Sequence, residues 1–177
     1  MPKIFTTAAV LLILALGFGK WEEFKSYDGR FRIMVPGPLE LRTKQIETEI
    51  GDIYYHTYML QSNDDQADNL VYMISYCDYP EGSVHSDSTA LLEEFFDTTV
   101  ETAMSSVNGN LRYSSKVQLK DYPGRIWRID YNDDQAVIKT KCFLVGSRYY
   151  SIQAITVKDR SLNPAMDRFF DSFELLE

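Results

Sequence analysis

The stretch Val117–Val157 reads VQLKDYPGRIWRIDYNDDQAVIKTKCFLVGSRYYSIQAITV and indicates the fold more directly than any other part of this 177-residue chain. Runs rich in β-branched and aromatic residues alternate with turn-forming groups at Asp121–Gly124, Asn132–Asp134 and Gly146–Ser147. Gly, Pro, Asn and Asp in such positions favour tight connections between antiparallel strands. The stretch therefore predicts an antiparallel meander.

Further β-type runs on the N-terminal side extend the predicted sheet. The run Leu70–Cys77 is largely apolar on both of its faces, which is typical of a central strand covered on both sides. We therefore expect helices to cover both faces of the sheet, at least in part. The other expected strands are Trp21–Tyr27, Arg30–Val35, a solvated Leu39–Glu49, Ile53–Gln61 and Leu111–Lys120.

Two helices are expected outside these strands. The first begins after capping residues at Ser86–Ser88 and runs to about Val107, with an apolar stripe at helical spacing. Asn163-Pro164 starts the second, with Asn as the N-cap and Pro in the first turn. The expected fold is α+β: a central antiparallel β-sheet with helices on both faces. The stripe of the first helix is Leu92, Phe96, Val100, Ala103 and Val107.

Residues 1–19 have the features of a signal peptide. Lys3 is the only charged side chain, Ala8–Leu16 is an unbroken apolar run, and Ala15-Leu16-Gly17 has the small-x-small pattern of a cleavage site. A short membrane anchor is the alternative, although a spanning helix needs about 20 apolar residues. We expect an exported chain, periplasmic or extracellular, with one domain at residues 20–177 and no stable membrane span after signal removal.

Charge and composition exclude some partners. The formal net charge is -8, and removal of Lys3 with the signal changes it to -9. An acidic surface repels phosphate backbones and anionic lipid, so we expect no nucleic-acid partner.

Cys77 and Cys142 both lie inside predicted strands. In an oxidising compartment they can form a disulfide, and otherwise they are two buried thiols that pack as small hydrophobic groups. The choice between a disulfide and two free thiols depends on which strands are neighbours in the sheet. The sequence leaves both alternatives open.

No established catalytic pattern accompanies the reactive residue types. His56 lies in an aromatic strand and His85 in a loop, and neither has a second ligand at metal-binding spacing. There is no G-x-S-x-G elbow and no glycine-rich phosphate loop. The acidic segment Asp64–Asn69 lacks the Gly and Glu positions of a helical calcium-binding loop and reads as a solvated turn. We predict no cofactor and no metal.

A pentapeptide, N-D-D-Q-A, occurs twice, at Asn63–Ala67 and Asn132–Ala136. An ancestral duplication and two independent turns with suitable residues both account for it.

Arg125 draws attention because it shares strand parity with the bulky apolar side chains of Trp127 and its neighbours. An arginine there can stack on an aromatic ring and pair with a carboxylate, as a structural device or as one wall of a groove. The predicted binding groove consists of Tyr54, His56, Tyr58, Arg125 and Trp127.

Several motifs together resemble the exported bacterial members of the PsbP-like superfamily, whose fold is shared with the extrinsic protein of photosystem II and with Mog-type Ran-binding proteins. The resemblance covers about the whole of residues 20–177 and implies an α/β/α sandwich, no enzyme activity, and action by binding other proteins. The motifs are DGRFRIMVPG (Asp28–Gly37), GDIYYHTY (Gly51–Tyr58), YCDYP (Tyr76–Pro80), LKDYPGR (Leu119–Arg125), KCFLVGSRYY (Lys141–Tyr150) and RFFDSF (Arg168–Phe173).

Three functional hypotheses follow. The first is a non-catalytic exported module that binds a protein of the cell envelope or the extracellular space. The second is a protein that binds a small ligand or divalent cation through the predicted aromatic groove. The third is a hydrolase whose catalytic residues are dispersed in sequence.

Overall fold

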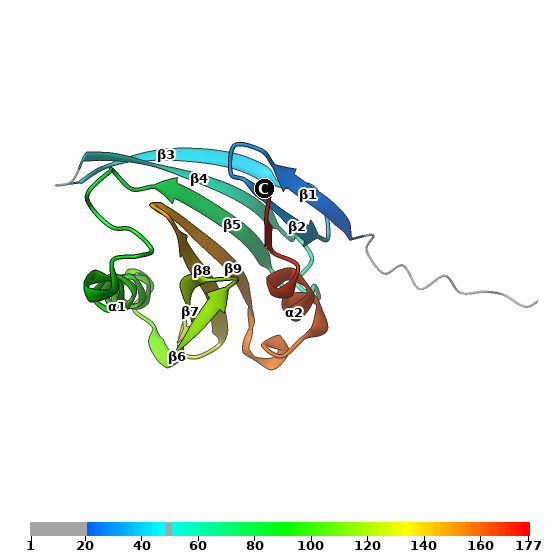
Figure 1. The fold of residues 1–177 in the computed structure, drawn as a ribbon. Helices are drawn as coiled ribbons and strands as arrows, with labels where there is room; N and C mark the ends of the chain where they lie inside the picture. The colour runs from blue at the N-terminus through cyan, green and yellow to red at the C-terminus, as the bar shows by residue number, and fades with distance from the viewer. Residues whose placement is uncertain (1–20, 49–50) are drawn as a thin grey trace, which may run out of the picture.

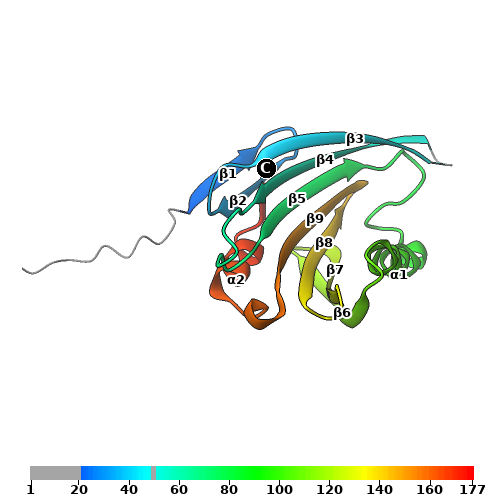
Figure 2. The same ribbon diagram turned by 180° about the vertical axis from the view of Figure 1, so that it is seen from behind.

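In the computed structural model, which describes residues 21–48 and 51–177, ten strands form two antiparallel sheets accompanied by two α-helices (Figures 1 and 2). The helices are α1 (Thr89–Ser106) and α2 (Pro164–Asp171), and Lys158–Arg160 forms a 3₁₀ turn. The strands are β1 (Glu22–Ser26), β2 (Phe31–Val35), β3 (Glu40–Thr48), β4 (Gly51–Gln61), β5 (Val71–Asp78), β6 (Asn110–Leu119), β7 (Tyr122–Tyr131), β8 (Ala136–Val145), β9 (Arg148–Val157) and β10 (Glu174–Leu175).

The large sheet has seven strands in the order β3-β4-β5-β9-β8-β7-β6, and the small sheet has the order β1-β2-β10. Strands β6 to β9 pair successively and antiparallel, so the predicted meander is confirmed. Helix α1 connects β5, near the middle of the sheet, with β6 at its far edge. The open edges of the large sheet are therefore β3 and β6.

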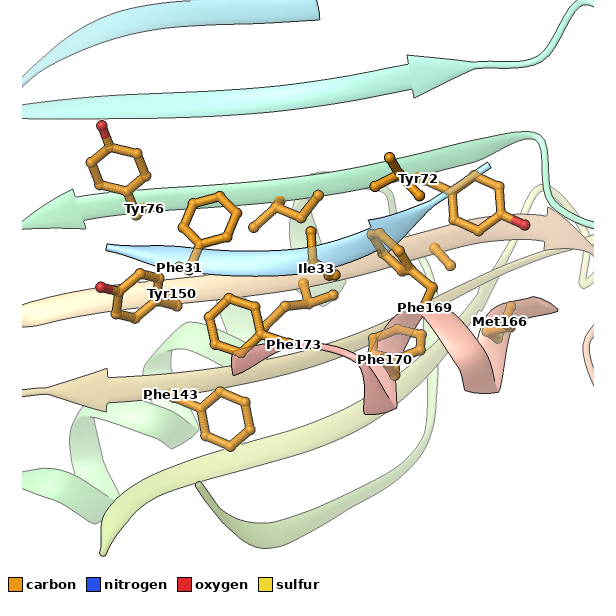
Figure 3. Close-up of a cluster of buried hydrophobic side chains, with 14 residues drawn as sticks. Phe31, Ile33, Tyr72, Tyr76, Phe143, Tyr150, Met166, Phe169, Phe170 and Phe173 are labelled. Carbon is orange, nitrogen blue, oxygen red and sulfur yellow. The ribbon is translucent and has the colours of Figure 1, made fainter. Parts of the chain in front are cut away.

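One side of the large sheet, face A, carries Tyr72 and Tyr76 of β5 (Figure 3), with Ile74 between them in the same core. These side chains pack against α2 and the small sheet, where Phe31 lies among the rings of Tyr58, Tyr76, Tyr150 and Phe173. The buried residues of this core are Phe31, Ile33, Val35, Tyr72, Ile74, Tyr76, Phe143, Tyr150, Ile152, Ala154, Met166, Phe169, Phe170 and Phe173.

The opposite side, face B, carries Cys77 of β5, Trp127 of β7 and Cys142 of β8. Phe96 and Val100 of α1 are buried against it. The other stripe residues predicted for this helix are partly buried against the same core. The predicted amphipathic helix is therefore confirmed, and α1 lies along face B.

The prediction of an antiparallel sheet in an α+β fold is confirmed, but the cover of face A differs from the expected layer of helices. A strand, β2, fills much of that position with Phe31, Ile33 and Val35, and α2 is only two turns long. Alternate residues of β2 are buried because one side of the small sheet packs on the large one.

The ends of the helices follow from local chemistry. Asn163 caps α2, since its side-chain oxygen accepts a hydrogen bond from the Met166 amide at 2.7 Å. Asn108, with a φ of 48°, follows α1 in the left-handed conformation that commonly ends helices. Ser88 occupies the predicted N-cap of α1, although its side chain makes no capping hydrogen bond.

The two N-D-D-Q-A segments lie in connections between adjacent antiparallel strands, β4–β5 and β7–β8. Asn132, Asp133 and Asp134 all have positive φ, whereas the described residues of Asn63–Ala67 have none. The identical pentapeptides therefore adopt different turns, which favours two independent turn sequences over a duplicated structural unit.

The predicted signal peptide lies outside the described residues. Within residues 21–48 and 51–177, no helix is long and apolar enough to cross a membrane.

Candidate functional site

The five residues predicted to form one groove lie on two strands and two faces. Tyr54, His56 and Tyr58 alternate along β4 on face A, where Tyr58 belongs to the surroundings of the core. Arg125 and Trp127 lie on β7 and belong to face B. Because β5, β9 and β8 separate β4 from β7, the structure does not bring the five together.

The histidines have simple surroundings. His56 Nδ1 lies 3.1 Å from Thr43 Oγ1, and the ring stacks on Tyr76 with centroids 4.7 Å apart. His85 Nδ1 lies 3.5 Å from Asp87 Oδ2 in an exposed loop. Among the described residues, neither histidine is hydrogen-bonded to a serine or cysteine nucleophile. The dispersed hydrolase site gains no support from these contacts.

Cys77 and Cys142 are both free thiols, so the structure does not contain the disulfide that the sequence left open. Both lie on face B, but β9 lies between their strands, with Cys77 opposite Tyr149 and Cys142 opposite Ser151. Two strand spacings amount to about 10 Å, beyond the roughly 7 Å that a disulfide allows between Cα atoms.

Burial raises the pKa of each thiol to about 12. Since the thiolate is the reactive form, neither cysteine is a ready nucleophile at neutral pH. Both act as small buried hydrophobic groups, which was the second reading of the sequence.

The acidic tip between β4 and β5 is organised by its own backbone. Asp64 accepts a hydrogen bond from the Gln66 amide at 2.9 Å, and Arg160 donates to the carbonyl oxygens of Asp65 and Ala67. Across the described ranges, no three His, Cys, Asp or Glu side chains are arranged to hold a metal ion. The segment is a turn held by Arg160.

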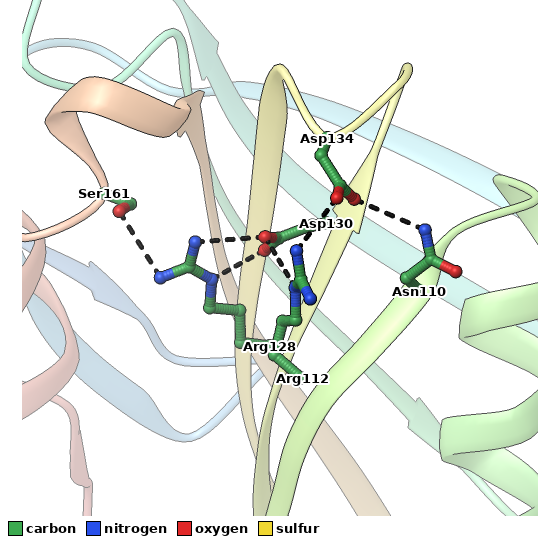
Figure 4. A network of polar contacts seen from close by, with 6 residues as sticks. All are labelled: Asn110, Arg112, Arg128, Asp130, Asp134 and Ser161. Atoms are coloured by element: carbon green, nitrogen blue, oxygen red, sulfur yellow. Dashed lines mark hydrogen bonds and ion pairs between the residues drawn. The ribbon is translucent and has the colours of Figure 1, made fainter.

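A buried carboxylate, Asp130, anchors the other end of the meander (Figure 4). It accepts hydrogen bonds from Arg128 Nε at 2.6 Å and from Arg112 Nε at 2.8 Å. Burial acts to raise the pKa of Asp130, but the two guanidinium groups outweigh it and lower that pKa. Arg112 continues to Asp134, and Arg128 to Ser161. Because every charge in this network has a partner, we infer that the network is structural and holds β6, β7 and the turn before α2 together.

Arg125 connects face B to α1. The residue is only 7% exposed, and its Nη2 group donates to Asp97 at 3.0 Å and to Glu93 at 3.3 Å. The guanidinium carbon lies 5.7 Å from the centre of the Phe96 ring. The structure therefore contains the predicted arrangement, in which Arg125 stacks on an aromatic ring and pairs with a carboxylate.

Helix α1 leaves an opening on each of its long sides. On one side lies a cavity of about 400 Å³ between α1 and the β6–β7 hairpin, which we call the Arg125 pocket. On the other lies a cavity of about 540 Å³ between α1, strand β4 and the segment that follows β5, which we call the Tyr55 groove. The groove is lined by Tyr55, Tyr79, Val84, Leu91, Glu94, Phe95, Thr98, Thr99 and Thr102.

The Tyr55 groove combines an aromatic floor with an open mouth. Burial raises the pKa of both Tyr55 and Tyr79, the latter to about 12, so both hydroxyl groups stay protonated at neutral pH. Phe95 packs edge-on against Tyr79 with ring centres 5.5 Å apart. Leu91, at the mouth, is 49% exposed. Sequence reasoning missed this site because Tyr55 has the opposite parity to the three β4 residues chosen.

A third opening, of about 560 Å³, lies at the end of the sheet where Arg30, Lys120 and Arg148 meet. Arg148 is already paired with both oxygens of Asp78, at 2.6 Å each, and it stacks on Tyr76. These contacts indicate that Arg148 is structural and connects the end of β5 with the start of β9.

Comparison with known proteins supports the fold. The solution structure of cyanobacterial PsbP (CyanoP) from Synechocystis sp. PCC 6803 matches with a TM-score of 0.56 at 9% sequence identity, over 91% of this chain and 95% of that chain. No protein-family model and no curated protein matches the sequence. At this identity the match shows a shared PsbP-like fold, and function has to be argued from the sites.

Proposed function

We propose that this protein is a non-catalytic binding module that recognises another protein through the Tyr55 groove. The observation that carries the proposal is an apolar, aromatic-floored opening that reaches solvent beside a half-exposed leucine. Aromatic anchors in a partly open pocket are the usual centres of protein interfaces.

The helix wall of the groove suits contact with a protein surface. Thr98 and Thr102 are exposed on α1, and Glu94 adds a negative charge at the rim. Short hydroxyl side chains allow a partner backbone to approach closely, and they offer hydrogen bonds around the apolar centre. An apolar centre with a polar rim is the common composition of such interfaces.

The edge strand β3 lies next to the groove and enlarges the available surface. Every residue of β3 is exposed, and Lys44 pairs in register with Tyr55 on β4. The outer edge of β3 presents backbone donors and acceptors to solvent, which is how a sheet accepts an extra strand. A partner segment at this edge is therefore within reach of the groove floor.

The remaining expectations complete the proposal. We place the protein among the exported bacterial PsbP-like proteins, in the periplasm or outside the cell, with its partner in the same compartment. The predicted signal peptide and the resemblance of the sequence motifs support this placement. The α/β/α sandwich and the relation to Mog-type proteins remain predictions.

Photo-crosslinking in the cells that produce the protein tests the proposed function. A photoreactive amino acid at Leu91 is expected to give one discrete adduct, whereas the same group at Tyr27, which is 80% exposed on the β1–β2 turn, gives none. The exposed groove substitution Thr98→Arg is expected to abolish the adduct. Ser105→Arg, exposed on the same helix but outside the groove, is the matched control. Equal labelling from positions 91 and 27, or none from 91, contradicts the proposal.

A further inference from the structure

The Arg125 pocket has features of a ligand site that protein recognition through the Tyr55 groove does not use. Its walls combine apolar groups with two cations, and its volume of about 400 Å³ falls in the range of small-molecule pockets. The lining residues that matter are Leu92, Phe96, Val117, Pro123, Lys116 and Arg125.

Arg125 is buried with unused hydrogen-bonding capacity. Within the described residues, only its Nη2 group has acceptors, and the buried Nε has none. A guanidinium carries five N–H donors in a planar fork that matches a carboxylate. A buried donor without an acceptor is costly and rare, so this one calls for a physical explanation.

Trp127 repeats the observation two residues further along β7. Its indole Nε1 is also buried and, among the described residues, lacks an acceptor. Residues two apart on a strand face the same way, so both unused donors belong to face B beneath α1. Trp127 is not among the residues that line the pocket, so the unused donor of Arg125 carries the argument and the Trp127 indole serves as a neighbouring reporter.

Two cations, Arg125 and Lys116, face the pocket, and the carboxylates of Glu93 and Asp97 balance their charge. Glu93 lies 2.7 Å from Lys116 and 3.3 Å from Arg125, so a carboxylate of the protein already bridges the two cations. Its hydrogen bond to Lys116, with the nearby positive charges, lowers the pKa of Glu93. The contact to Arg125 is the longer one, and an incoming carboxylate can replace it while Glu93 keeps Lys116.

We propose that the Arg125 pocket binds a small amphipathic carboxylic acid in its anionic form. The carboxylate takes the unused donors of Arg125, and the apolar body lies against Phe96 and Leu92 between α1 and the β6–β7 hairpin. The pocket is separate from the Tyr55 groove, so this proposal stands or falls independently of protein recognition.

Nuclear magnetic resonance of ¹⁵N-labelled protein tests the proposal, because the sequence has two tryptophans. The substitution Trp21→Phe assigns the two indole N–H signals. Titration with 4-phenylbutyrate or octanoate is expected to shift the Trp127 indole signal saturably and to leave Trp21 unchanged. The matching amides, which lack the charge, are expected to bind at least about 10-fold more weakly.

Substitutions provide the second arm. Arg125→Gln is expected to weaken the acids by about 10- to 100-fold, the range for a charged hydrogen bond. Lys120→Gln removes the same charge from an exposed residue that lines a different cavity, and it should have no effect. If Arg125→Gln does not fold, the comparison of acid with amide on the unsubstituted protein still decides. The proposal is overturned if neither acid gives a saturable shift, if the amides bind equally, or if Lys120→Gln weakens binding as much as Arg125→Gln.

Discussion

Replacing Asp130 with asparagine is expected to destabilise the meander strongly, because this carboxylate is only 1% exposed and satisfies two arginines. Its oxygens accept hydrogen bonds from Arg128 Nε at 2.6 Å, Arg128 Nη2 at 3.2 Å and Arg112 Nε at 2.8 Å. An asparagine side chain at this position would present an amide N–H₂ to donors. It would remove the carboxylate that pairs with Arg128 and would leave Arg112 with Asp134 as its counter-charge.

The magnitude follows from that geometry. Removing one partner of a buried charge pair costs about 3–5 kcal/mol, and a hydrogen bond to a charged group contributes about 1.5–3 kcal/mol. Both arginines retain some contact with water, at side-chain exposures of 20% and 43%, so rehydration recovers part of the loss. We expect Asp130→Asn to lower the free energy of unfolding by about 2–3 kcal/mol and the Tm by about 5–10 °C.

The effect should depend on pH in a defined direction. The pKa of Asp130 in the folded protein lies below the ordinary 3.8. The stability that its charge contributes is therefore complete well above 3.8 and is lost as the pH falls through the lowered value. The difference between wild type and Asp130→Asn should be the same at about pH 7 and about pH 5, and smaller below the ordinary pKa.

Urea denaturation followed by circular dichroism at each pH measures this difference. Asp134→Asn is the matched control in the same network, since Asp134 is 37% exposed and accepts hydrogen bonds from Arg112 and Asn110 at the outer side of the network. It should cost less than about 1 kcal/mol. A difference below about 0.5 kcal/mol for Asp130→Asn at neutral pH, or one that persists unchanged in acid, refutes the reasoning.

Three further predictions concern packing, capping and the thiols. Gly124→Ala should destabilise the protein by about 2–4 kcal/mol in urea denaturation, because the added Cβ would clash with the backbone carbonyl oxygen of Cys142 and lie 2.5 Å from the Phe143 ring. Gly37→Ala, with its nearest neighbour at 3.5 Å, should change stability by less than about 1 kcal/mol, and equal effects refute the packing account. Asn163→Ala should lower the free energy of unfolding by about 2–3 kcal/mol, because it removes both the α2 cap and a reciprocal amide pair with the buried Asn69. A loss of about 1 kcal/mol, which is that of a cap alone, counts against a role for the pair. Neither thiol should react with a disulfide reagent before the protein unfolds, because both are buried and protonated. An intact mass that is lower without reductant than with it by about 2 Da, roughly two hydrogens, would reveal a disulfide instead.

Local patterns predict the elements of this fold well because their causes are local. The predicted turns at Asn132–Asp134 and Gly146–Ser147 connect adjacent strands, and Asn163-Pro164 begins α2 as expected. The turn predicted at Asp121–Gly124 lies earlier, at Lys120-Asp121, because Tyr122, Pro123 and Gly124 already pair with β6 as part of β7. The two apolar faces of Leu70–Cys77 correctly indicated a sheet covered on both sides. Each of these features depends on residues within a few positions of one another.

The layer over face A was harder to predict because the covering element is itself a strand. The alternation of Phe31, Ile33 and Val35 says that one side of β2 is buried, but it does not say against which sheet. Its partners on β5 and α2 lie far along the chain.

The candidate site shows the same limit. Parity correctly placed Arg125 with Trp127, and residue type correctly predicted an aromatic and carboxylate environment. The order of strands in the sheet has no local signature, so Tyr54 was grouped with residues of a distant strand on the opposite face. The same uncertainty left the relation between Cys77 and Cys142 open.

Amide hydrogen exchange of the protein alone and with its crosslinked partner tests recognition through the Tyr55 groove most directly. The proposal predicts slower exchange in the partner complex along Leu91–Thr102 of α1 and along β3 and β4, with the β1–β2 turn unchanged. Slower exchange confined to other elements, with α1 and β4 unchanged, would contradict it.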